Sequence, residues 1–338
     1  FDEIQDCPEA LNSLKYFSED LPEIFLVGAG SLLGVYLSSH SFPVGKVQFL
    51  DLHPLSFAEY LRAIKKDKLA AKLESLNVDN NKYHEDFVEE LKKYFTIGGM
   101  PKAVLTYIET KDYQRVREIQ ENLIIGYRSD FAKYSGPAEA MKILSVFENI
   151  PKQLAKDNRK FQFKLLKTGA RYTHFSMAID WLVAAGLCYK IPIIDHAEVP
   201  LKPYVDENSF KLYFFDVGLL AAHSDLPVLS FLRESNLFKT FKGAFVENYF
   251  LQEFNAHRRE EMYCWQGKSS EVDFLYCNEK SELVPVEVKS GESGKLKSLQ
   301  FFAEKYQCPW KIRSSMLPIE IRKDTKLKSI PLQYASLV

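Results

Sequence analysis

The sequence has 338 residues, of which 46% are hydrophobic and 14% aromatic, and its formal net charge at pH 7 is -1. This composition excludes a disordered chain, and the length favours two or three domains. The balance of charge excludes a protein that binds polyanions over its whole surface, so a nucleic-acid surface would have to be a local basic patch. No apolar run is long enough to span a bilayer, and we therefore expect no membrane partner.

The five cysteines are scattered along the chain, and none forms a C-x-x-C pair. This spacing argues against a structural zinc site and against a disulfide framework. Free thiols are typical of a reducing compartment, so we expect a cytoplasmic protein.

The first third of the chain reads as strands followed by helices. Apolar runs at 23–27 and 46–52 predict two buried strands, the first stopped by glycines at 28 and 30. Pro54 opens a helical pattern, and residues 85–135 keep helical spacing on both sides of a Gly-Gly-Met-Pro break at 98–101. We therefore predict the end of an α/β core at 1–60 and a helical lid at 61–136.

Residues 137–205 have the pattern of a winged helix, because helices around 143–154 and 176–185 lead through Gly186 into a strand. The same region carries a basic stretch in which Phe161 and Phe163 are interleaved. On a winged helix such a stretch would suit phosphate contacts with DNA, whereas the alternative is a solvated helix face. The basic residues are Lys152, Lys156, Arg159, Lys160, Lys164, Lys167 and Arg171.

From residue 206 to 338 the pattern is α+β. A strand near 210–215 precedes a helix at 245–256, and the segments EMYCWQ, EVDFLY and LVPVEVK predict three closely spaced strands before a closing helix at 297–306.

Acidic residues and a lysine recur on these last strands. Glu287 and Lys289 share one face of a strand, and a hairpin would bring Asp273 beside Glu287. Glu247 stands on an otherwise apolar helical face, where a carboxylate is costly unless it is paired or bound to metal. Converging carboxylates with a nearby lysine suit Mg²⁺ or Mn²⁺ and phosphodiester cleavage. The alternative is a structural ion-pair network among the same four residues.

A second acidic pair, Asp2 and Glu3, follows directly on Phe1. It is similar to the end of a Walker B strand, where Asp2 would serve Mg²⁺ and Glu3 would polarise the hydrolytic water, with Ser31 as a polar sensor. The alternative is a pair of helix-capping acids. No G-x-x-x-x-G-K-[ST] motif is present, so we expect the chain to begin after the P-loop and to bind ATP only with that missing N-terminal segment.

Several motifs in this order support a family resemblance over essentially the whole chain. They are FDEIQ, GAGS, PVGKVQFLDLHPLSFAEYL, YFTIGGMPKAV, QENLIIGYRSDFAKY, KFQFK, PLKPY, FKLYFFDVGLL, KGAFVENYFLQE and EVDFLY with VPVEVKSG. The sequence resembles prokaryotic ATPases in which an AAA+ module is fused to a C-terminal domain of unknown function with a restriction-endonuclease-like core.

The resemblance implies a multidomain α/β and α+β fold with four parts: a partial AAA+ core at 1–60, a helical lid at 61–136, a winged-helix-like domain at 137–205 and a restriction-endonuclease-like domain at 206–338. It assigns Asp2 and Glu3 to the Walker B acids. Lys46 stands where such proteins often carry an arginine near the nucleotide, which puts an arginine-finger role there in doubt.

In the C-terminal domain the resemblance assigns Glu247, Asp273, Glu287 and Lys289 to a nuclease-like cluster. It further implies DNA as a partner, a role in mobile elements or defence, and leaves a homo-oligomer through the AAA+ module open. A non-catalytic nucleic-acid or protein binding module remains the alternative.

Overall fold

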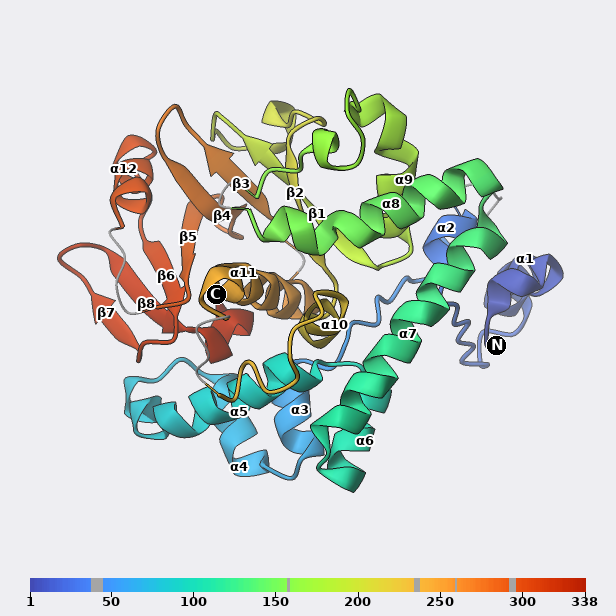
Figure 1. Ribbon diagram of the computed structural model, residues 1–338, viewed down its shortest axis with the longest axis horizontal. Coiled ribbons are helices and arrows are strands. Elements are labelled where there is room, and N and C mark those ends of the chain that lie inside the picture. The colour runs from blue at the N-terminus through green and yellow to red at the C-terminus, as the bar shows by residue number, and fades with distance from the viewer. Residues whose placement is uncertain (38–44, 157–158, 234–237, 259, 292–295) are drawn as a thin grey trace.

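A computed structural model of the chain describes residues 1–338 except 38–44, 157–158, 234–237, 259 and 292–295 (Figure 1). Its described residues form a mixed α/β structure with a helical half and a half built on one eight-stranded sheet. The expected mixed α/β class is therefore confirmed, whereas the four-domain division stays a prediction. No helix in the described ranges is long and apolar enough to cross a membrane.

The helices precede most of the strands along the chain. The α-helices before the sheet are α1 (Pro8–Asp20), α2 (Leu33–Leu37), α3 (Phe57–Ala63), α4 (Asp67–Ala70), α5 (His84–Ile97), α6 (Pro101–Thr110), α7 (Tyr113–Tyr134), α8 (Pro137–Leu154) and α9 (Tyr172–Ala184). Short 3₁₀ helices are η1 (Ile4–Asp6), η2 (Ala71–Glu74), η3 (Val78–Tyr83), η4 (Phe163–Leu165), η5 (Lys202–Tyr204) and η6 (Leu332–Leu337).

Local sequence explains where several of these helices begin. Ser56 caps α3 in a reciprocal capping box with Glu59, and the Asp112 side chain accepts hydrogen bonds from the first turn of α7. Pro101 occupies the first turn of α6, where its missing N–H costs nothing. The predicted break between α5 and α6 is therefore confirmed.

The sheet runs in the order β2-β1-β3-β4-β5-β6-β8-β7. Its strands are β1 (Cys188–Ile194), β2 (Phe210–Phe214), β3 (Tyr263–Gln266), β4 (Glu271–Cys277), β5 (Leu283–Lys289), β6 (Lys311–Ser315), β7 (Glu320–Arg322) and β8 (Leu327–Pro331). Because β1 pairs antiparallel with β2 and parallel with β3, the strand in the predicted winged-helix range lies in the same sheet as the C-terminal strands. The boundary expected between residues 205 and 206 falls between two paired strands.

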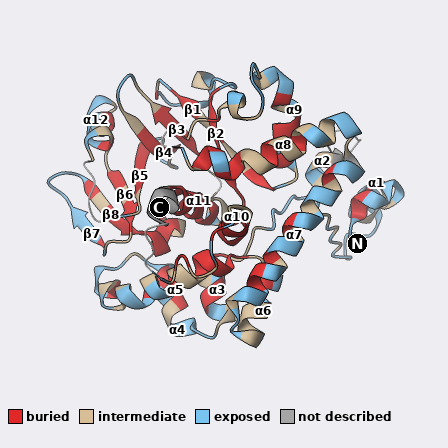
Figure 2. Ribbon diagram, viewed as in Figure 1, coloured by how far each residue is buried: buried red, intermediate tan, exposed pale blue. Residues whose placement is uncertain are grey.

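Helix α11 (Phe238–His257) lies between the sheet and the helical half (Figure 1). Its Phe250 ring stacks on Phe274 of β4 at 5.3 Å, while Tyr249 meets Phe95 of α5 edge to face at 5.2 Å. Burial follows this arrangement, because α11 and the neighbouring α10 (Val217–His223) are buried along most of their length (Figure 2). A helix that is buried on nearly every side is typical of the centre of a protein.

A second, smaller core lies under α12 (Lys297–Lys305), where Leu299 and Phe302 pack with Trp265 of β3 and Leu275 of β4. The sheet is thus covered by helices, and the strands β3 to β5 read as nearly continuous buried runs. The predictions for these three strands and for the closing helix are confirmed.

Two strand predictions near the N-terminus are wrong. Residues 23–27 and 46–52 form no strand in the described structure, and Phe25 and Leu52 are fully exposed. Within the first run, Ile24 N–H donates to Leu21 O at 3.0 Å, as in a turn, and the N-terminal ammonium of Phe1 donates to Val27 O at 2.7 Å. An apolar run becomes a buried strand only when neighbouring strands take up its backbone hydrogen bonds.

Candidate functional site

The four residues expected to form a nuclease-like cluster come from α11, β4 and β5. Glu247 lies on α11, Asp273 on β4, and Glu287 with Lys289 on β5. Strands β4 and β5 pair antiparallel, and α11 packs against β5. Val286 and Val288 belong to the large core, so Glu287 and Lys289 alternate with core positions as the sequence predicted.

The β4–β5 ladder ends just where the acidic residues begin. Its last backbone pair is Phe274 with Val286. One residue beyond that pair, the carboxylate Oδ2 of Asp273 accepts a hydrogen bond from the backbone N–H of Val288 at 2.9 Å. Asp273, Glu287 and Lys289 are thereby held together at the point where the two strands separate.

Glu247 is almost completely buried, and both of its oxygens are occupied. Oε1 forms an ion pair with Nη1 of Arg159, and Oε2 accepts a hydrogen bond from the Tyr213 hydroxyl at 2.9 Å. Burial raises the pKa of Glu247 and the charge of Asp273 adds to this rise, while Arg159 opposes it. Glu247 is thus a buried acid satisfied by an arginine and a tyrosine.

Glu287 and Lys289 form an ion pair through Glu287 Oε1. The second oxygen of Glu287, Oε2, is buried and has no hydrogen-bond partner among the described residues. Burial raises the pKa of Glu287 to about 8, and the nearby charge of Asp273 contributes, while Lys289 counteracts it. Burial alone would lower the pKa of Lys289, but Asp273 and Glu287 outweigh it, so its pKa is raised.

A divalent cation at this cluster would need several oxygen ligands. The donors present are carboxylate oxygens, which Mg²⁺ and Mn²⁺ prefer, and no described residue donates a hydrogen bond to Glu287 Oε2. In the arrangement described, however, no group of three or more His, Cys, Asp or Glu side chains within the described ranges is placed to hold a metal ion. The donor chemistry fits a cation, but both oxygens of Glu247 are already engaged, by Arg159 and Tyr213.

Sequence reasoning missed Tyr213 and Lys211, two buried residues of β2 beside the acids. The Tyr213 hydroxyl donates to Glu247, and the Nζ of Lys211 is buried 4.0 Å from Glu271 Oε1, with no hydrogen-bond partner in the described ranges. Burial lowers the pKa of Lys211, but Cys264, Glu247 and other neighbours reverse this and raise it. The alternation in FKLYFFD, with a lysine inside an apolar strand, was the available signal.

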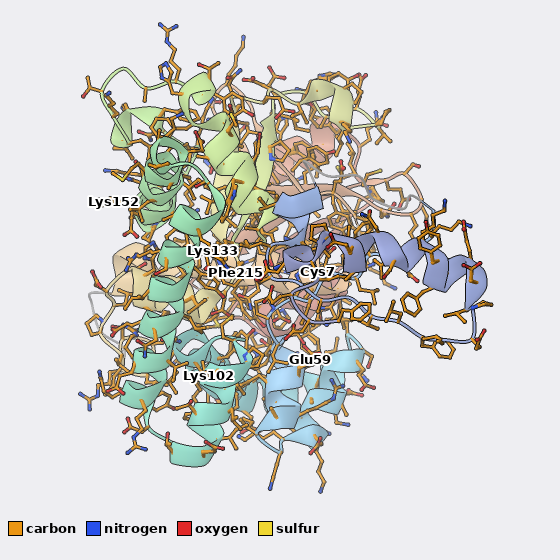
Figure 3. All side chains as sticks on the ribbon, turned by 90° about the vertical axis from the view of Figure 1, so that its right-hand side faces the viewer. Cys7, Glu59, Lys102, Lys133, Lys152 and Phe215 are labelled. Carbon is orange, nitrogen blue, oxygen red and sulfur yellow. The ribbon has the colours of Figure 1, made fainter. Side chains whose placement is uncertain are left out.

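The basic stretch divides between the surface and this buried site. Lys152 of α8 lies at the surface (Figure 3), as do Lys156, Lys164, Lys167 and Arg171, whereas Lys160 is half-buried. Arg159 is largely buried against Glu247. The interleaved aromatic residues are part of the core, because Phe161 stacks on Phe210 at 5.3 Å and Phe163 packs against both.

The N-terminal acids lie close to the predicted sensor. Glu3 Oε2 accepts hydrogen bonds from Gln5 Nε2 at 2.5 Å and from Ser31 N and Oγ at 3.3 and 3.2 Å. The bond from Gln5 is the main reason that the pKa of Glu3 is lowered. Glu3 precedes η1 but makes no side-chain cap there, and Asp2 is exposed.

Lys46, the remaining residue expected near nucleotide, forms an ion pair with Glu19 of α1 at 3.3 Å. Helix α1 projects at the side of the molecule (Figure 3). The structure therefore joins Glu3 to Ser31 and pairs Lys46 with an acid of α1.

Comparisons with known proteins divide the chain into three consecutive segments. Residues 1–61 match an AAA domain, residues 88–230 a domain of unknown function (DUF8612), and residues 242–334 another domain of unknown function (DUF4143). No curated protein and no solved structure matches the chain. The chain is therefore similar to AAA-type ATPases that carry additional domains of unknown function.

Proposed function

We propose that the chain belongs to an ATP-driven protein that acts on DNA and that its sheet half holds a metal-dependent nuclease-like site. The ATPase class follows from the AAA match. The nuclease-like chemistry is supported by one observation above all: Asp273, Glu287 and Lys289 meet where β4 and β5 separate, and Glu287 Oε2 is buried without a hydrogen-bond partner among the residues that the structure describes.

Each residue has a distinct proposed role. Asp273 and Glu287, joined by Glu247, would hold Mg²⁺ or Mn²⁺, which supplies charge neutralisation and an activated water when bound. Lys289 would place its ammonium beside the phosphodiester and stabilise the negative charge that develops there. The raised pKa of Lys289 keeps this group charged over the physiological range of pH.

In the AAA domain, Asp2 would serve Mg²⁺ and Glu3 would orient the hydrolytic water, with Ser31 and Lys46 nearest to the nucleotide phosphates. The hydrogen bonds from Ser31 to Glu3 support this grouping. These 338 residues hold no G-x-x-x-x-G-K-[ST] motif, so ATP turnover would need a phosphate-binding segment supplied in addition.

Metal binding and strand cleavage test the nuclease-like site. Asp273→Asn should abolish Mn²⁺ binding measured by calorimetry and Mn²⁺-dependent nicking of supercoiled DNA. Glu279→Gln, in the exposed β4–β5 turn, is the matched control and should leave both unchanged. Equal Mn²⁺ binding and nicking by Asp273→Asn and the parent would refute the assignment.

The second candidate is a non-catalytic binding module in which the same residues are structural. It is favoured by the ion pairs Arg159–Glu247 and Lys289–Glu287, which already neutralise two of the three acids. A buried pair of this kind is costly to break from one side, whether or not it stabilises the fold. The thermal comparison of Asp273→Asn in the Discussion separates this candidate from the first.

A further inference from the structure

Arg159 reaches the acidic cluster from the segment that follows α8. Its side chain is 18% exposed, its Nη1 pairs with Glu247, and its Nε is buried with no hydrogen-bond partner in the part of the chain that the structure describes. A guanidinium has five N–H donors, and one left unpaired inside a protein is unfavourable. Withdrawal of this side chain toward solvent would therefore recover hydration for Nε while it breaks the ion pair.

Gly243 makes room for the guanidinium on α11. A Cβ at Gly243 would lie 2.6 Å from Nη2 of Arg159, far closer than a real contact allows. Gly243 stands four residues before Glu247, so the two positions share one face of the helix. The glycine thus provides the space in which Arg159 lies beside Glu247.

The ion pair and a metal ion need the same oxygen. With Oε1 bound to Arg159 and Oε2 to Tyr213, Glu247 has both oxygens engaged. Within the described ranges, the three acids do not form a metal-holding group as they stand, and both oxygens of Glu247 already have partners. A cation and a guanidinium on one carboxylate oxygen exclude each other by charge and by volume.

We propose that Arg159 is a latch on Glu247, and that Glu247 joins Asp273 and Glu287 around a divalent cation only when Arg159 withdraws. This inference rests on the metal site proposed above and names how that site is regulated. Arg159 is thus a positioning residue, which controls a ligand without touching the cation.

Two variants should separate Arg159 from Glu247 in different ways. Arg159→Ala removes the competing charge, whereas Gly243→Ala keeps the charge and displaces it, because the clash is with the far end of a flexible side chain. Alanine is also a better helix former than glycine, so Gly243→Ala should fold even if Arg159→Ala does not. Calorimetric titration with MnCl₂ alone should show affinity about tenfold tighter for each variant than for the parent, within the usual range of coupling between sites.

The control variants make the same two substitutions, arginine to alanine and glycine to alanine, at positions that do not contact Glu247. Arg128→Ala breaks an exposed arginine–carboxylate pair with Glu148, and Gly126→Ala adds a methyl group to a helix position with nothing within 4 Å. Both should bind Mn²⁺ like the parent. Equal affinity in the parent, Arg159→Ala and Gly243→Ala would overturn the latch and leave the metal site standing. Absence of Mn²⁺ binding in all of them would overturn both proposals.

Discussion

The carboxylate of Glu253 on α11 accepts a hydrogen bond from the backbone N–H of Phe57, the first residue of α3, at 2.8 Å. This bond joins two positions 196 residues apart and ties the sheet half to the helical half. Glu253 is buried, and burial raises its pKa to about 8 from the ordinary 4.5. One link between the two halves is therefore made by a buried acid that favours its protonated form.

The stability of the protein should depend on pH through this group. Between about pH 4.5 and pH 8 the folded protein keeps the proton of Glu253 and the unfolded chain has lost it, so the stabilisation present below pH 4.5 falls as pH rises through 8. Glu253→Gln keeps an oxygen for Phe57 N–H but cannot ionise. Urea unfolding from about pH 5 to about pH 9 measures the effect. With each pH unit, the free energy of unfolding of the parent should fall by up to about 1.4 kcal/mol more than that of Glu253→Gln. Glu279→Gln is the control, and parallel pH curves for the parent and Glu253→Gln would contradict the prediction.

Gly98 should be among the least replaceable residues of the helical half. Its φ is 74° and its ψ is -173°, a region open to glycine alone, and a Cβ there would lie 2.3 Å from Asp216 Oδ1. Asp216 is buried, caps α10 and accepts a hydrogen bond from Gly99 N–H at 2.7 Å. Gly98→Ala should lower the free energy of unfolding by about 2–4 kcal/mol.

Gly126→Ala is the matched substitution, because Gly126 is an exposed position inside α7. It should raise the free energy of unfolding by about 1 kcal/mol through helix propensity. Chemical denaturation of both variants measures the contrast. A decrease at Gly98 no larger than about 0.5 kcal/mol would show that the α5–α6 turn does not require glycine.

Asp273→Asn separates the two candidate functions by thermal stability. Asparagine keeps an oxygen for the Val288 N–H, so the substitution removes charge and little else. A metal site predicts a melting temperature slightly above that of the parent in chelator, by the equivalent of roughly 1 kcal/mol, because the repulsion with Glu287 is relieved.

The metal-site hypothesis also predicts that Mn²⁺ raises the melting temperature of the parent and leaves that of Asp273→Asn unchanged. A structural ion-pair network predicts that Asp273→Asn melts at a lower temperature than the parent in chelator. The reason is that the ammonium of Lys289 loses the favourable interaction with the Asp273 charge. A lower melting temperature for Asp273→Asn in both buffers, with no Mn²⁺ shift in the parent, would favour the structural candidate.

The exposed basic residues that follow α8 should bind DNA without sequence preference. Replacing Lys164, Lys167 and Arg171 by alanine should weaken binding to a short duplex. It should also reduce the slope of log affinity against log salt by about 0.9 for each phosphate that the variant no longer neutralises. The control replaces three exposed lysines of the helical half, namely Lys65, Lys68 and Lys72. Fluorescence anisotropy at several salt concentrations measures the affinity and the salt slope of each triple variant. Identical slopes for the two variants would rule out a DNA surface at this place.

Much of the sheet half was readable from the sequence. Apolar runs with β-branched and aromatic residues predicted β3, β4 and β5, and the alternation in β5 placed Glu287 and Lys289 away from the core positions Val286 and Val288. Strands β6 to β8 were not predicted, because their short segments are polar enough to read as loops. Sequence also indicated that Glu247 needed a partner, since a lone carboxylate on an apolar helix is unfavourable.

Only the tertiary structure decided which residue that partner is. Arg159 and Glu247 are 88 residues apart, and no local pattern links them; the basic stretch alone placed Arg159 at a DNA surface. Likewise the runs at 23–27 and 46–52 carry strand-like sequence but lie exposed, because a strand needs neighbours that local sequence does not specify. Local residue patterns determined the secondary structure near the acids, whereas long-range packing determined which charges face one another.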